Sequence, residues 1–311
     1  MEECKRLFKR DKIFLLCLSG AVVFILLAGF INGWRLVRQL LEMKASFMEI
    51  HGEAFVEEFF SDDGMIFSEI LEYACISMMK WIFAVVLLAQ ILKWGVLEGR
   101  RGREFANQLP LKSAGYVTYD YILGILFLWI PIAVEFIAVM LLSKGYGLTF
   151  MGKDVNENCV EIIKELILVS FLYSLLVLSK KITRYIPGIF LTVPVVFGIG
   201  AILGWDISVF WDLGRYSPGE RSGYLLLAAS VPVIVALSYW CDKKRDIAGN
   251  GLFYFKPVHF LMMAAIFAEL FCIFLNSEII QRGMAANVVG ILIAGTVTAG
   301  VHYLTWGERS R

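Results

Sequence analysis

The sequence predicts an all-α polytopic membrane protein with about eight transmembrane helices (six to eight) and both termini in the cytoplasm. Of the 311 residues, 59% are hydrophobic, whereas soluble domains are about 45–50% apolar. The mean hydropathy is +0.70. Several apolar runs approach the roughly 20 residues that a helix needs to cross a bilayer. The formal net charge is only +1, so no global field favours nucleic acid as a partner.

Eight segments meet or approach the length of a membrane span, and we interpret residues 1–311 as a single transmembrane domain. The segments lie at about residues 13–34, 74–95, 120–142, 165–180, 186–205, 223–240, 258–275 and 285–305. The fourth and the seventh are the shortest, which is why the predicted number ranges from six to eight.

The first span follows a basic N-terminal segment. Five basic residues precede the apolar run: Lys5, Arg6, Lys9, Arg10 and Lys12. A signal peptide also begins with basic residues, but its apolar region is only about 7–15 residues long and ends at a small-residue cleavage site. This run is longer and no A-x-A sequence follows it. The pattern therefore predicts an uncleaved first span.

Residues 35–73 form the longest polar stretch and are predicted to lie outside the cell. They contain three basic and nine acidic residues, and their apolar residues recur at helical spacing. We expect one or two amphipathic helices here, broken near Gly52 and Gly64. A cap that packs on the outer ends of the spans is the preferred interpretation, and a gate or ligand-contacting lid is the alternative.

Three charged residues fall inside predicted spans, where a charge is costly. Lys80 lies in the second span, Glu135 in the third, four residues after Pro131, and Glu269 in the seventh. They are candidates for a polar lining of a substrate path. The alternative is structural, with Lys80 paired to Glu135 or Glu269, or with a carboxyl group kept protonated. Either use would place these side chains toward the inside of a helix bundle.

The segment between the second and third spans, residues 96–117, is predicted to be a cytoplasmic loop. It carries Arg100, Arg101, Arg103 and Lys112, and cationic loops between spans stay on the cytoplasmic side. The loop is too long for a minimal turn and contains helix-forming residues before Pro110. These properties make it a candidate surface for a cytosolic partner.

A second cytoplasmic loop is predicted at residues 241–257, after the sixth span. Lys243, Lys244 and Arg245 would lie at the lipid headgroups, and residues 252–255, which are apolar and aromatic, would lie in the interface. In the last span, small residues define one face suited to close helix packing. They are Gly290, Ala294, Gly295, Ala299 and Gly300. This face could pack within the chain or against another subunit.

The distribution of basic residues predicts the orientation. With the N-terminus in the cytoplasm, 19 basic residues lie on cytoplasmic segments and 8 on outer ones. Such an excess is the usual signal for the cytoplasmic side. Removal of one span would place a basic cluster outside, so an even number of spans is favoured.

Motifs for catalysis or metal binding are not found in the sequence. The chain has no G-x-x-x-x-G-K-[ST] loop for nucleotide phosphates and no H-E-x-x-H. Its histidines, His51, His259 and His302, lie far apart in the sequence, and its six cysteines form no C-x-x-C pair. We therefore expect no enzyme activity, no bound cofactor and no metal site in this chain.

The two cytoplasmic loops together resemble those of the permease subunit of bacterial type-2 ABC exporters. In the first loop, Glu98, Gly102, Phe105, Leu109-Pro110 and Lys112 follow the family pattern. In the second, the matching residues are Asp246, Ala248, Gly249 and the aromatic run Phe253 to Phe255. The resemblance covers about residues 13–275. Many members of this family have six spans, so the role of the last two predicted spans is not assigned by it.

The resemblance implies a function and partners. A separate cytosolic ATP-binding subunit would hold ATP and Mg, and a helix over about Glu98 to Leu109 would lie in a groove of that subunit. The residues expected to couple to it are Glu98, Arg100, Arg101, Arg103, Glu104 and Phe105. A second permease copy, or a related permease, would complete the exporter in the cytoplasmic membrane of a bacterium.

An alternative from another class is a stand-alone membrane protein. It would be a secondary transporter that uses Glu135 or Glu269 for proton coupling, or a membrane sensor that uses the acidic outer loop. Copurification of an ATPase would decide between the two classes.

Overall fold

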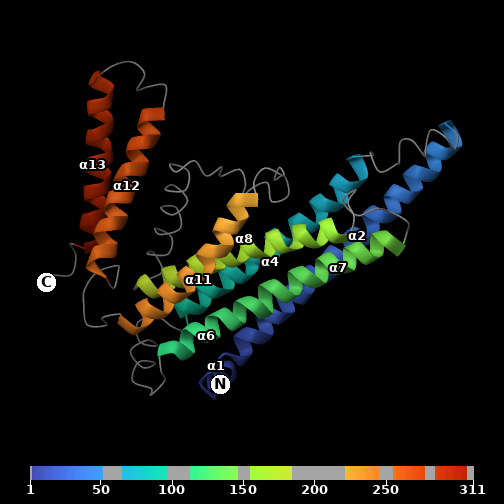
Figure 1. Cartoon of the computed structure of the whole chain (residues 1–311), viewed down its shortest axis with the longest axis horizontal. Coiled ribbons are helices and arrows are strands. Elements are labelled where there is room, and N and C mark those ends of the chain that lie inside the picture. The colour runs from blue at the N-terminus through green and yellow to red at the C-terminus, as the bar shows by residue number, and fades with distance from the viewer. Residues whose placement is uncertain are drawn as a thin grey trace. The chain divides into compact units, whose positions relative to one another are not determined.

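The computed structural model describes residues 2–51, 65–96, 113–145, 155–183, 221–244, 255–276 and 284–306. These residues are almost entirely helical, and no β-strand element occurs among them (Figure 1). The prediction of an all-α fold is confirmed for these segments. The number of eight spans and the cytoplasmic position of the termini stay predictions.

The described helices cover predicted spans, but three of them are much longer than the spans they contain. In chain order they are α1 (Glu2–Arg10), α2 (Lys12–His51), α4 (Met65–Val96), α6 (Ser113–Gly124), η1 (Ile125–Trp129), α7 (Ile130–Gly145), α8 (Val155–Ile182), α11 (Arg221–Lys244), α12 (Lys256–Asn276) and α13 (Met284–Trp306). The largest difference lies in α2, which continues without a break from the first predicted span to His51. Helices α4 and α8 begin about ten residues before their predicted spans. The expected breaks at Gly52 and Gly64, and the predicted span at 186–205, lie outside the described residues.

Two of the described helical segments are long and apolar enough to cross a membrane. They are Lys12–Ile50 and Gly115–Ala138. Shorter apolar helical stretches occur at Lys256–Ala268 and Val288–Tyr303. Large apolar side chains such as Ile13, Phe24 and Leu292 are more than 60% exposed, so these helices do not bury all of their apolar surface within the chain.

The chain forms two units. The first comprises Met1–Gln90, Thr118–Tyr173 and Asp212–Val231, and the second comprises Ile91–Val117, Ser174–Trp211 and Pro232–Arg311. In the first unit α2 packs along α7 (Figure 1). In the second, α12 and α13 form a pair of neighbouring helices, with Met262, Met263 and Ile266 as the buried cluster between them.

A π-helical turn, η1, joins α6 to α7 just before Pro131. The backbone N–H of Ile130 donates to the carbonyl of Ile125, five residues earlier, instead of four. Proline has no N–H to donate, and its ring crowds the carbonyl four residues before it. A wider turn ahead of Pro131 lets the helix continue past this disturbance. The proline is thus accommodated by a local widening of the helix.

Candidate functional site

The predicted coupling residues all lie outside the described residues, and so does the side chain of Glu269 on α12. The coupling residues are Glu98, Arg100, Arg101, Arg103, Glu104 and Phe105. The structure does place the two helices that flank the loop: α4 ends at Val96 and α6 begins at Ser113. The remaining predicted site residues, Lys80 and Glu135, lie on α4 and α7.

Glu135 is buried where three helices of the first unit meet. Its side chain belongs to α7 and is only 3% exposed. Its carboxyl group lies against the backbone of Gly29 on α2, close to Met78 on α4: a Cβ atom at Gly29 would overlap Glu135 Oε1 and crowd Met78 Cγ. The glycine therefore provides the space that the carboxyl group occupies. The sequence predicted the inward position but gave no reason to connect Gly29 with Glu135.

Lys80 is half-buried on α4. Within the described segments, no lysine or arginine lies within ion-pair distance of the Glu135 carboxyl group. A buried carboxylate without a cation is costly, and protonation or a bound cationic group removes that cost. This position can therefore bind a proton, or contact a cationic or hydrogen-bonding group that enters the bundle.

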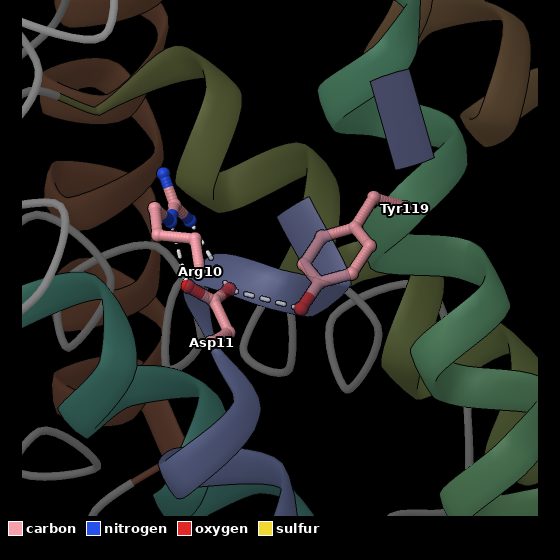
Figure 2. Close-up of polar contacts among 3 residues, drawn as sticks. All are labelled: Arg10, Asp11 and Tyr119. Carbon is pink, nitrogen blue, oxygen red and sulfur yellow. Dashed lines mark hydrogen bonds and ion pairs between the residues drawn. The ribbon is translucent and has the colours of Figure 1, made fainter. Parts of the chain in front are cut away.

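A second buried carboxyl group, Asp11, lies between α1 and α2 (Figure 2). It accepts hydrogen bonds from Arg10, at 2.6 Å from Nε and 3.1 Å from Nη2, and from the Tyr119 hydroxyl of α6 at 2.9 Å. Phe8 packs edge-on against the Tyr119 ring, with the centroids 5.0 Å apart. Sequence reasoning missed this contact. One feature of the sequence could have indicated it: Asp11 is an acidic residue within a basic run, directly before a predicted span.

A buried ion pair connects the C-terminal ends of α8 and α11. Lys181 Nζ lies 3.3 Å from Asp242 Oδ1, and neither side chain is more than 4% exposed. Lys181 is one of the 19 basic residues that the predicted orientation places on cytoplasmic segments. The charges of Lys181 and Asp242 are enclosed by protein.

Two histidines that are far apart in the sequence meet between α12 and α13. His259 Nε2 and His302 Nδ1 are 2.8 Å apart, which is a hydrogen bond. His259 lies near the start of α12 and His302 near the end of α13, so an antiparallel pair of helices brings them to the same level. Within the described residues no group of three or more His, Cys, Asp or Glu could hold a metal ion. The pair thus fastens two helices together.

Comparison with known protein families, with curated proteins and with solved structures gives no match to this chain.

Proposed function

We propose that this chain is the membrane-spanning permease subunit of an ATP-driven exporter, working with a separate cytosolic ATPase in the cytoplasmic membrane of a bacterium. The observation that carries the proposal is the basic segment at residues 97–116 between two long apolar segments. The position of this segment between two helices is supported by the structure. Helix α4 ends just before the segment, at Val96, and α6 begins within its last residues, at Ser113. The membrane-length helical stretch Gly115–Ala138 starts in α6.

The multi-pass topology is supported by the contacts between helix ends. Asp11 and Tyr119 join the N-terminal ends of α2 and α6. Lys181 and Asp242 join the C-terminal ends of α8 and α11. Each pair links two ends that the distribution of basic residues places on the same, cytoplasmic, side. For α8 and α11, parallel spans require a return crossing between them, which the predicted span at 186–205 would provide.

Labelling tests this topology directly, and the structure selects the positions. The native Cys241 is buried and would stay unlabelled on either side of the membrane. Ile50 and Lys244 are exposed and lie on opposite sides in the proposed topology. In a cysteine-free background, a membrane-impermeant maleimide should label Ile50→Cys in intact cells and Lys244→Cys only after permeabilisation. Labelling of Lys244→Cys in intact cells would contradict the topology.

Coupling to an ATPase is tested by charge reversal. Changing Arg100, Arg101 and Arg103 to Glu replaces attraction with repulsion at the proposed contact. The variant should insert normally, because the other cytoplasmic clusters hold the topology, but the ATPase should no longer copurify. Phe105→Ala should weaken the association without changing the charge.

The matched control reverses three other basic residues on the same expected side, Lys243, Lys244 and Arg245. These are expected at the lipid headgroups, so the ATPase should still copurify. If the Arg100, Arg101 and Arg103 variant keeps a partner ATPase and its stimulated hydrolysis, this segment is not the coupling element.

One observation favours a second candidate function, a proton-coupled carrier. It is the carboxyl group of Glu135, which is buried at the junction of α2, α4 and α7. If no ATPase copurifies with the wild-type chain, this second function is preferred. Proton uptake by proteoliposomes that is lost in Glu135→Gln would then support it.

A further inference from the structure

The N-terminal helix α1 divides its side chains between two faces. Leu7 is 2% exposed and Asp11, one turn later, is also buried. Arg6, Lys9 and Arg10 are exposed, and their spacing of three and four residues places them together on the outer face. Lys12, at the start of α2, is exposed as well. Arg10 is ion-paired with Asp11, so we call the other three, Arg6, Lys9 and Lys12, the basic face.

Contacts with α6 hold this face in a fixed orientation. Phe8 packs on Tyr119. Asp11 accepts a hydrogen bond from the Tyr119 hydroxyl (Figure 2). The helix also continues through Asp11, because the N–H of Asp11 donates to Leu7 O at 3.0 Å and the N–H of Leu15 donates to Asp11 O at 2.9 Å. The apolar side of α1 is therefore covered by protein, and the basic face points away from it.

The carboxyl group of Asp11 is buried and pairs with Arg10. The side chains of Arg6, Lys9 and Lys12 present their positive charge at the surface. Directly beyond Lys12, Ile13 is 78% exposed and Leu16 is 62% exposed. Cationic side chains next to exposed apolar ones at the start of a membrane-length helix match the boundary between phospholipid headgroups and acyl chains.

We propose that the basic face binds the headgroups of anionic phospholipids in the cytoplasmic leaflet, with the Asp11–Tyr119 contact fixing its orientation toward the membrane. The proposal requires that the chain lies in a membrane, and it does not depend on an ATPase partner. Its failure would therefore leave the coupling proposal untouched, and the reverse also holds.

The test uses the purified full chain in a neutral detergent. Its thermal unfolding midpoint is measured while phosphatidylglycerol or phosphatidylcholine is added. Phosphatidylglycerol should raise the midpoint in a saturable way, and phosphatidylcholine at the same concentration should not. Inorganic phosphate is added separately. A rise equal to that with phosphatidylglycerol would show a site for free phosphate and overturn the proposal.

Substitutions locate the site. Lys9→Gln together with Lys12→Gln removes two exposed charges and should weaken the apparent affinity for phosphatidylglycerol about fivefold per charge. The matched control removes two exposed charges further along α2, Arg35→Gln with Arg38→Gln, and should leave the affinity unchanged. An equal loss in both double variants, or no loss in the first, would overturn the proposal.

Discussion

Replacing Asp242 with alanine is expected to lower the stability of the protein by about 3–5 kcal/mol, the usual effect of removing one partner from a buried ion pair. The reason is the environment of Lys181. Its side chain is only 4% exposed, and its amino group lies 3.3 Å from the Asp242 carboxyl group. Without that carboxylate, a buried positive charge loses a close counter-charge, and the ends of α8 and α11 lose one of their contacts.

The effect can be measured as the temperature at which the detergent-solubilised protein loses its monodisperse peak in size-exclusion chromatography. Lys244→Ala is the matched control, because Lys244 is exposed two residues further along the same helix and should change little. A double variant, Lys181→Met with Asp242→Leu, removes both charges and should recover most of the stability, since an apolar pair of similar size avoids the cost of burying ions. An unchanged transition in Asp242→Ala would show that the pair does not hold these helix ends.

The fold could be predicted from the sequence where a long apolar pattern dominates. The first predicted span lies within α2, and the last lies within α13, because about 20 apolar residues in a row leave few alternatives to a helix. The ends of the helices were harder to predict from the sequence. Residues 35–51 are polar enough to suggest a separate segment, yet α2 extends through them, because nothing in this stretch stops a helix before Gly52.

The candidate site was predictable only in part. The inward position of Glu135 follows from the cost of a charge in a span, so it could be inferred from one residue. The contacts of Asp11 with Tyr119 and of His259 with His302 could not, because they join residues on different helices. A sequence gives the spacing along one helix, whereas such contacts depend on which helices pack together and at what level. For the same reason, the sequence does not indicate that Gly29 lies beside Glu135.

The second large effect concerns another glycine, Gly124, which lies at the end of α6 beside the ring of Tyr173 from α8. A Cβ atom at Gly124 would overlap the Tyr173 ring. The ring cannot easily move aside, because it is 4% exposed and its hydroxyl donates a hydrogen bond to the carbonyl oxygen of Asp120 at 2.6 Å. Gly124→Ala must therefore displace a ring that is held at both ends, next to the π-helical turn η1.

Overpacking of a filled core costs about 1–3 kcal/mol, and alanine returns about 1 kcal/mol in a helix interior. We therefore expect Gly124→Ala to destabilise the protein by up to about 2 kcal/mol. Gly20→Ala on α2 is the matched control, because a Cβ atom there has no neighbour within 4 Å. Only the gain in helix propensity remains, so the thermal transition temperature should rise or stay the same. The two substitutions are chemically identical, and the structure predicts opposite signs for them.

A third variant separates the ring from its hydrogen bond. Tyr173→Phe keeps the ring beside Gly124 and removes the bond to Asp120, which should cost about 0.5–1.5 kcal/mol. With the hydroxyl gone, the ring is free to tilt, so adding Gly124→Ala to Tyr173→Phe should cost less than adding it to the wild type. The same thermal measurement is made on the four proteins of this double-mutant cycle: the wild type, the two single variants and the double variant. Equal costs in the two backgrounds would mean that the hydrogen bond does not hold the ring against Gly124, and the close packing of α6 on α8 would then need another explanation.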